Sequence, residues 1–186
     1  MSDDRQLLLD YARHGDVKSL SALVVGNAKW LTAYLRGLSP SEADAEDAFQ
    51  MTWEKVIRSC GSYRGGSVRA YLIRIARSVT IDRFRRDRLP TVSADAVGDS
   101  GESIAEMLAD EAPTPGETFE SSATAEDVRR AIQALPEGQR EVVLMRIEGE
   151  LAFKEIAELM GIPLGTALTW MHNATGTLKK MLGERK

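Results

Sequence analysis

Residues 67–87 carry two kinds of side chain that a single helix would place on different faces. Val68, Leu72, Ile75 and Val79 recur at helical spacing, and that spacing is typical of a helix packed on an apolar core. Arginines occupy other positions of the same stretch. The pattern therefore predicts an amphipathic helix with a core stripe and a basic face.

From Arg64, in the loop before this stretch, to Arg88, just after it, every basic residue is arginine. Only Asp82 and Asp87 oppose them, so eight arginines minus two aspartates give a local charge of +6 in a chain whose net charge is −4. A solvated surface helix usually mixes its charges, so a run of one sign favours phosphate as the partner. The arginines are Arg64, Arg69, Arg74, Arg77, Arg83, Arg85, Arg86 and Arg88.

The predicted helix before the Gly61–Gly66 joint, about residues 42–59, has the opposite chemistry. Ser41 stands three residues before Asp44 and resembles a capping box with Asp in place of Glu. Carboxylates beside aromatic rings favour a protein surface as the partner. These residues are Asp44, Glu46, Asp47, Phe49, Trp53 and Glu54.

Two further helices are predicted before residue 40. The first covers residues 3–14 and ends at Gly15. The second is capped by Asp16 and runs to about Arg36 with apolar residues at helical spacing.

The composition changes sharply between Leu89 and Thr124. This stretch has no Lys or Arg, and its eight carboxylates give it a charge of −8. Proline, glycine and serine interrupt it, which is typical of a linker. A plain spacer and a segment that repels nucleic acid, or occupies a basic channel of a partner, both remain open.

The last third of the chain predicts a helix-turn-helix. One helix follows Ala125, and Pro136 stands where the next can begin. Residues 153–160 then form a helix, Gly161 supplies a tight turn, and a new helix begins with Thr166 as its cap. In such motifs the second helix lies in the DNA major groove.

Composition excludes several other classes. The single cysteine, Cys60, gives no intramolecular disulfide and no metal set, which favours a reducing cytoplasm. No apolar run has a membrane-spanning length, and the polar start MSDDRQ is not typical of a signal peptide. No nucleophile with a base and no phosphate-binding glycine loop is recognisable, so we expect neither an enzyme nor a cofactor.

Three segments together resemble the extracytoplasmic-function (ECF, group IV) sigma factors of bacterial RNA polymerase. DAEDAFQMTWEKV resembles region 2.2, YRGGSVRAYLIRIARSVTIDRFRRDR resembles regions 2.3 and 2.4, and LPEGQREVVLMRIEGELAFKEIAELMGIPLGTALTWMHNATGTLKKML resembles region 4. The resemblance implies an all-α chain of two small helical domains, a region 2 domain at 1–89 and a region 4 domain at 125–186. A flexible acidic linker at 90–124 would join them.

The resemblance also implies partners: core RNA polymerase through its largest-subunit clamp helices and its flap, promoter DNA, and an anti-sigma factor. The clamp contact would fall on Asp44, Glu46, Asp47, Gln50 and Trp53, with Trp53 as hot spot or, alternatively, as a core residue.

Contact with the −10 element would fall on the basic helix and its preceding loop. Tyr63 would form the wall of a pocket for an unstacked base, whereas Tyr71 and Phe84 fit the core better. The complete set implied is Tyr63, Arg64, Arg74, Arg77, Ser78, Asp82, Arg83, Arg85 and Arg86.

Contact with the −35 element would fall on the recognition helix. Family members usually carry several basic residues there, and this chain has Leu168, Trp170 and Asn173 instead. We therefore expect either weak binding to the −35 element or recognition of its bases through apolar contacts. The apolar residues expected to be exposed around Trp170 and Met171 could also bind a protein partner. The implied set is Arg146, Lys154, Thr166, Leu168, Thr169, His172 and Asn173, and His172 has no metal partners at ligand spacing.

The function that the resemblance implies is a sigma factor that binds core RNA polymerase, directs promoter recognition and helps to melt the DNA. Two other functions stay open. A sigma-like decoy would bind an anti-sigma factor without driving transcription, and the weakly basic recognition helix favours it. An ordinary helix-turn-helix regulator would leave the first half of the chain without a role.

Overall fold

The computed structural model describes residues 3–87 and 124–183, and of residues 82–87 it describes the backbone only. Within these ranges the chain forms helices and no strand, which confirms the all-α prediction there. The first range holds α1 (Asp4–His14), α2 (Val17–Leu38), α3 (Glu42–Ser59), the 3-10 turn η1 (Cys60–Ser62) and α4 (Val68–Asp87). The second holds α5 (Ala125–Gln133), α6 (Glu137–Ile147), α7 (Phe153–Met160) and α8 (Leu164–Gly183).

Local chemistry sets the first helix boundaries where the sequence predicted them. Gly15 ends α1 in the left-handed conformation, at φ 67°, and so reverses the chain. The Asp16 carboxylate then accepts hydrogen bonds from the backbone N–H groups of Lys18 and Ser19, which satisfies donors that the first turn of α2 leaves unpaired.

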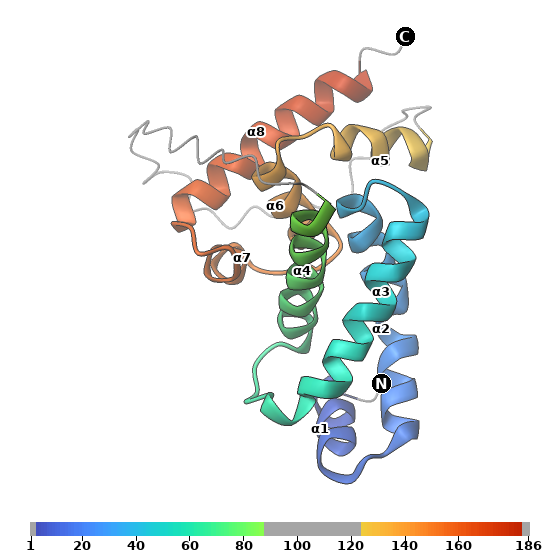
Figure 1. Cartoon of the computed structure of the whole chain (residues 1–186). Coiled ribbons are helices and arrows are strands. Elements are labelled where there is room, and N and C mark those ends of the chain that lie inside the picture. Colours follow the sequence, from blue (N-terminus) through green and yellow to red (C-terminus); the bar gives the residue numbers. More distant parts are fainter. Residues whose placement is uncertain (1–2, 88–123, 184–186) are drawn as a thin grey trace.

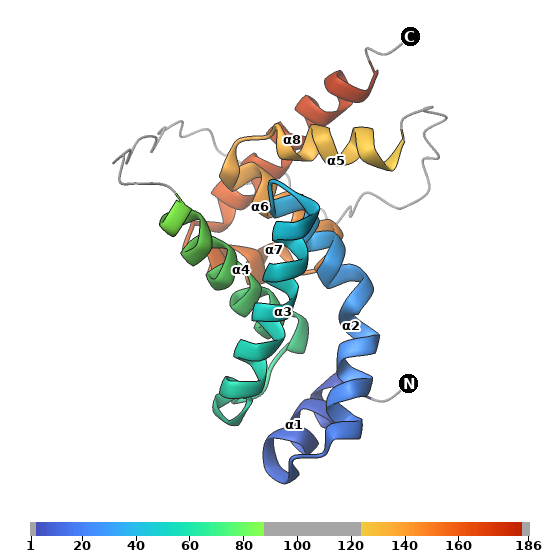
Figure 2. The same ribbon diagram turned by 45° about the vertical axis from the view of Figure 1, so that its right-hand side comes forward.

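The four helices of the first range pack into a bundle. Helix α2 contacts α1, α3 and α4, and α1 lies across one end of the bundle (Figures 1 and 2). The inward side chains are mostly leucine and aromatic, and several have no exposed surface. Among these are Leu8, Leu23, Leu31, Tyr34, Leu35, Val56, Leu72 and Ile73.

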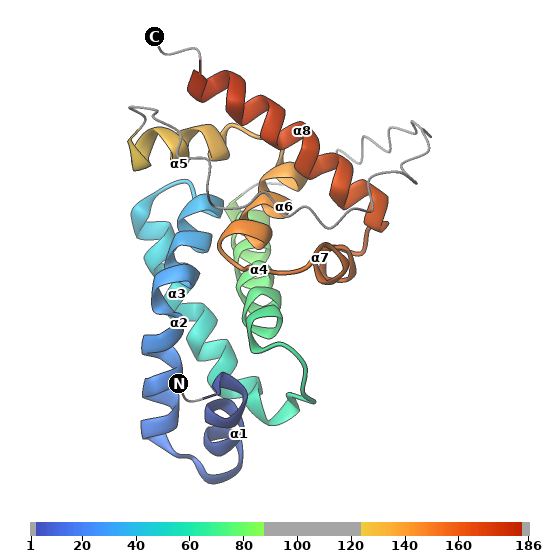
Figure 3. The same cartoon turned by 180° about the vertical axis from the view of Figure 1, so that it is seen from behind.

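The second range forms a smaller bundle in which α8 spans the other helices (Figure 3). Gly161 has φ 68° and closes α7, as predicted, and Ala157 of α7 is buried. The last helix begins at Leu164, two residues before Thr166. Thr166 therefore lies inside the first turn and is not its cap, because the turn already begins at Pro163, whose carbonyl accepts from the Thr166 N–H at 3.0 Å.

The two ranges pack on each other. Helix α6 contacts α2, and α7 contacts α4 (Figure 1). Buried residues of α2 and α4 form one apolar cluster with Val142, Leu144 and Met145 of α6. The sequence pattern predicted two separate domains and contains no local signal of this shared core. The predicted linker, residues 90–124, lies outside the described residues except for Thr124.

Candidate functional site

The polar residues predicted to bind polymerase lie on the outer side of α3. The Ser41 hydroxyl accepts from the Asp44 backbone N–H at 3.1 Å and donates to the Asp44 carboxylate at 2.6 Å, so Ser41 caps the start of α3. Asp44 is half-buried, and Glu46, Asp47 and Gln50 are exposed. The structure thus brings these four side chains together on an accessible helix surface.

Trp53, the fifth residue of that set, lies in the core. It is 6% exposed, and its ring meets Phe49 edge-on with centroids 6.3 Å apart. Its indole nitrogen has no hydrogen-bond partner among the described residues. The core alternative is therefore the one the structure favours, because a hot spot must offer its ring to the partner and this ring supports α3 from beneath.

The loop after α3 buries the residue predicted to stack on a base. Tyr63 is 8% exposed, its hydroxyl donates to the Gly66 carbonyl at 2.6 Å, and its ring meets Tyr71 edge-on at 5.2 Å. Burial raises the pKa of the Tyr63 phenol. Tyr63 therefore offers little open surface in this conformation, because its ring packs within the loop, and its contact with a base stays a prediction. Arg64 beside it is exposed and donates to the Gly61 carbonyl at 3.3 Å.

Helix α4 presents its predicted basic residues in two environments. Arg74 is exposed, whereas the Arg77 side chain is 28% exposed and is held in the contact with α6. The side chains of Asp82, Arg83, Arg85 and Arg86 lie outside the described residues, and their DNA contacts stay predictions.

Ser78 lies beside a basic residue that the sequence analysis missed. Lys55 of α3 donates from Nζ to the Ser78 hydroxyl at 2.8 Å, and that hydroxyl donates to the Ile75 carbonyl at 2.8 Å. The ammonium group therefore adds positive charge next to the predicted −10 residues. The Lys55 side chain is exposed.

Arg77 is bound by a carboxylate from the second half of the chain. Its Nε donates to Glu141 of α6 at 2.8 Å, and the Glu141 side chain is 7% exposed. Burial raises the pKa of the Glu141 carboxyl, and the hydrogen bond from Arg77 opposes that rise. Tyr34 lies in the same region, fully buried, with no hydrogen-bond partner for its hydroxyl among the described residues.

The predicted −35 residues of α8 form an exposed but weakly basic surface. Thr169, His172 and Asn173 are exposed, and Leu168 is half-buried. The Thr169 hydroxyl donates to the Gly165 carbonyl at 2.9 Å, which leaves its methyl group as the free end. Such a helix can offer an amide, an imidazole and methyl groups to base edges, with little charge for phosphate.

Two of the predicted contacts at the edge of this surface differ in their surroundings. Arg146 donates to the Leu151 carbonyl at 3.0 Å, and its guanidinium lies 5.3 Å from the centre of the Phe153 ring. Lys154 is exposed. Arg146 thus stabilises the loop between α6 and α7. Its guanidinium could bind a DNA phosphate only while it also keeps these contacts.

Trp170 and Met171 are half-buried, so the expected exposed apolar patch is smaller than predicted. The indole of Trp170 packs against Gly138 at the start of α6. Apolar residues lie on more than one side of α8. Helical spacing alone therefore does not show which of them are packed and which are exposed. Packing on α6 decides the matter here.

The described residues hold no group of three or more His, Cys, Asp or Glu side chains that could bind a metal ion. Among them, no helix is both long and apolar enough to cross a membrane.

Two models of known families match the two halves. Sigma-70 region 2 matches residues 23–89, and Sigma-70, region 4 matches residues 125–178. Together they cover the α3 and α4 surfaces and the helix-turn-helix. The chain belongs to the sigma-70 family, as a member of its extracytoplasmic-function group.

Curated relatives carry matching names. The ECF RNA polymerase sigma factor SigE of Mycolicibacterium smegmatis is 30% identical, over 79% of this chain and 55% of the relative. SigW of Bacillus subtilis is 29% identical over 60% of each. The sigma-E factor of Salmonella typhimurium is 29% identical, over 87% of this chain and 85% of the relative. The match thus spans just over half the length of the first two relatives.

Solved structures share the fold. CnrH, in complex with the cytosolic domain of CnrY, has a TM-score of 0.68 and 20% identity, over 98% of this chain and 99% of the other. The sigma factor RpoE of Bartonella quintana, in complex with the anti-sigma factor NepR, has a TM-score of 0.67 and 20% identity, over 91% and 100%.

Proposed function

We propose that this protein is an ECF-type sigma factor that binds core RNA polymerase, directs it to a restricted set of promoters and helps to open the duplex. The observation that carries the proposal is that one family member combines a surface suited to polymerase with helices suited to DNA. An exposed acidic and amide surface on α3 adjoins the arginine-bearing helix α4, and a helix-turn-helix follows in the same chain.

Polymerase binding is assigned to Asp44, Glu46, Asp47 and Gln50. Exposed carboxylates suit a basic target such as the clamp helices of the largest subunit, because opposite charges guide the encounter. Trp53 supports this surface from the core by packing on Phe49. The second half of the chain would contact the flap.

Promoter opening is assigned to α4 and its preceding loop. Separating the strands costs stacking energy, so the protein must hold the released strand in a better place. Arg64, Arg74 and Arg77 would hold its backbone, with Ser78 and Lys55 between them. Asp82, Arg83, Arg85 and Arg86 would extend the same track.

Reading of the −35 element is assigned to α8. The exposed Asn173 amide suits adenine, and the Thr169 methyl suits the methyl group of thymine. His172 and Leu168 complete the surface, and Lys154 supplies a phosphate contact. Because this surface carries little positive charge, we expect its contribution to affinity to be small.

The remaining assignments follow from this function. Residues 1–89 form the region 2 domain and residues 125–186 the region 4 domain, with 90–124 as an acidic linker. The protein acts in the cytoplasm without catalysing a reaction, and an anti-sigma factor restrains it. The complex of RpoE with NepR is an example of such a pair in another bacterium.

Transcription in vitro tests the proposal. Purified protein and bacterial core polymerase are incubated with fragments of the source genome, and run-off transcripts are sequenced from their 5′ ends. We expect new start sites that share upstream motifs and that disappear with an Asp47→Ala/Gln50→Ala variant. Stable core binding with no new start site would contradict promoter-directing function.

A further inference from the structure

We propose that the free chain holds its two halves docked on each other, and that the docked state withholds Arg77 from nucleic acid by placing it on Glu141. The role of Arg77 in DNA binding rests on the proposed function. The docking itself does not, because it follows from contacts between the halves.

Two of the polar contacts of this interface involve arginines of α4. Arg77 donates to Glu141 at 2.8 Å, across 64 residues of sequence. About two turns earlier on the helix, Arg69 pairs with Glu150 in the loop before α7, and its guanidinium lies 5.0 Å from the centre of the Trp30 ring. Both arginines therefore pair with a carboxylate of the second half, and for Arg77 that carboxylate stands where DNA would offer a phosphate.

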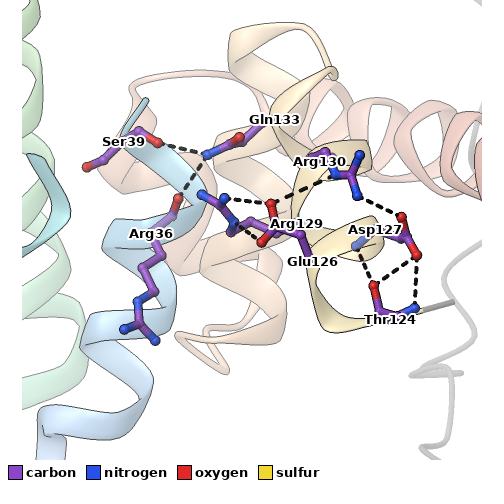
Figure 4. A network of polar contacts seen from close by, with 8 residues as sticks. All are labelled: Arg36, Ser39, Thr124, Glu126, Asp127, Arg129, Arg130 and Gln133. Carbon is purple, nitrogen blue, oxygen red and sulfur yellow. Dashed lines mark hydrogen bonds and ion pairs between the residues drawn. The ribbon is translucent and has the colours of Figure 1, made fainter. Parts of the chain in front are cut away.

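A third contact fixes the far end of α2. The side-chain amide of Gln133, in α5, donates to the carbonyls of Ser39 at 2.8 Å and Arg36 at 3.2 Å (Figure 4). These carbonyls belong to the last turn of α2 and the residue after it, where helix hydrogen bonding leaves acceptors unpaired. The α5 side chain thus completes the end of a helix in the other half.

Apolar packing makes the docking close. Leu144 of α6 is 2% exposed and lies so near Gly37 of α2 that a β-carbon there would overlap the end of the leucine side chain. In the same way, a β-carbon at Gly149 would overlap the Cδ1 atom of Ile73. The halves approach at two glycines, and bulk at either would separate them.

The docked state covers the two proposed surfaces unequally. Asp47 and Gln50 on α3 remain exposed, while Arg77 is mostly buried against Glu141. The closed chain therefore keeps its polymerase-binding surface and loses part of its single-strand-binding surface. This arrangement would suppress binding to stray nucleic acid before polymerase is engaged.

A pair of glycine variants on one helix tests the inference. Gly37→Leu places a side chain in the interface, whereas Gly26→Leu on the same α2 meets nothing within 4 Å and serves as the control. Both changes remove a helical glycine, so both favour α2 itself. Glu141→Arg gives a second route to opening, through like charges at Arg77, should Gly37→Leu fold poorly.

Two measurements are made on each full-length chain: small-angle X-ray scattering, and anisotropy of a fluorescein-labelled oligothymidine at low salt. We expect compact wild type and Gly26→Leu, and expanded Gly37→Leu and Glu141→Arg. If the closed form outnumbers the open one by about ten to one, opening should tighten oligothymidine binding by up to about tenfold, and by less to the extent that the exposed Arg64 and Arg74 bind in the closed form.

A wild-type chain as expanded as Gly37→Leu would overturn the docking. Expansion with unchanged, measurable oligothymidine affinity would overturn the withholding of Arg77. Expansion with no oligothymidine binding by any chain would leave docking supported and would count against the proposed single-strand function instead.

Discussion

Trp170 of α8 lies so close to Gly138 of α6 that a β-carbon at Gly138 would overlap its indole ring. The contact joins α8 to α6, the helix that packs on α2 of the first half. Because the ring is rigid, it cannot move aside by a small rotation of its end.

Gly138→Ala should therefore destabilise the protein, by about 1–3 kcal/mol, the usual cost of overpacking. Chemical denaturation checks this. Gly176→Ala is the matched control, because Gly176 lies in α8 with nothing within 4 Å of its notional β-carbon. Equal stability of the two variants would contradict the packing of Trp170 on α6.

Tyr34→Phe should stabilise the protein. The Tyr34 hydroxyl is buried without a hydrogen-bond partner among the described residues, and removing such a group relieves a penalty of about 1 kcal/mol or more. Tyr71→Phe should act in the opposite direction by about 1 kcal/mol, because the Tyr71 hydroxyl shares a 2.9 Å hydrogen bond with Ser59. Denaturation midpoints of the two variants against wild type give the comparison, and a loss of stability in Tyr34→Phe would show that its hydroxyl is satisfied.

The docked state should weaken as pH rises through the titration of Glu141. Burial raises the pKa of this carboxyl above its ordinary value of 4.5, and Arg77 opposes the rise. Tyr34 faces it from α2, and Glu137 and Arg140 face it from its own helix. Opening returns the pKa to its ordinary value, so the docked state binds more protons in the interval above 4.5. The contribution of Glu141 to the stability of the docked state is complete below pH 4.5 and is lost as pH rises through the raised pKa.

Scattering across this pH interval measures the effect: the wild type should stay mainly compact, with a larger open fraction at the upper end of the interval than at the lower. Glu148 has a pKa that burial also raises, and it titrates with the same sign. Glu141→Gln therefore isolates the contribution of Glu141, and it should reduce the pH dependence. An undiminished pH dependence in Glu141→Gln would assign the titration to other groups.

Arg74→Ala should lower the salt dependence of single-strand binding. Arg74 is exposed on α4, and removing one phosphate-neutralising side chain reduces the slope of log K against log salt by about 0.7 for a single strand. Oligothymidine anisotropy at several salt concentrations gives the slope. Arg58→Ala, which removes an exposed arginine paired with Glu54 on α3, should leave it unchanged.

Much of the fold could be predicted from the sequence because its signals are local. The Asp16 cap, the glycine turns at Gly15 and Gly161 and the helical class are all confirmed. Each depends on a few neighbouring residues. The start of α8 was misplaced because Thr166 is a good cap by composition, while Pro163 already begins the turn.

The burial of aromatic residues could not be predicted in the same way. Trp53 was interpreted as a hot spot or, alternatively, as a core residue, and Tyr63 as the wall of a base pocket; both are buried. The local sequence around each residue allows its ring to point either to solvent or to the core. Tertiary packing decides between the two. The pairing of Arg77 with Glu141 was also beyond local signals, because the partners are far apart in the chain and belong to halves predicted to be separate.

Binding to core RNA polymerase tests the central claim most directly. Wild type, Asp47→Ala/Gln50→Ala and Asp10→Ala are each passed with purified bacterial core polymerase over a size-exclusion column. Asp10→Ala removes a carboxylate from α1 and serves as the control, and Trp53 is left intact because its loss would disturb the core. We predict stable co-elution of wild type and Asp10→Ala, and binding weakened about tenfold or more in the double variant, a loss of about 1.4 kcal/mol. Failure of wild type to co-elute, or equal binding by all three chains, would contradict polymerase binding through the α3 surface.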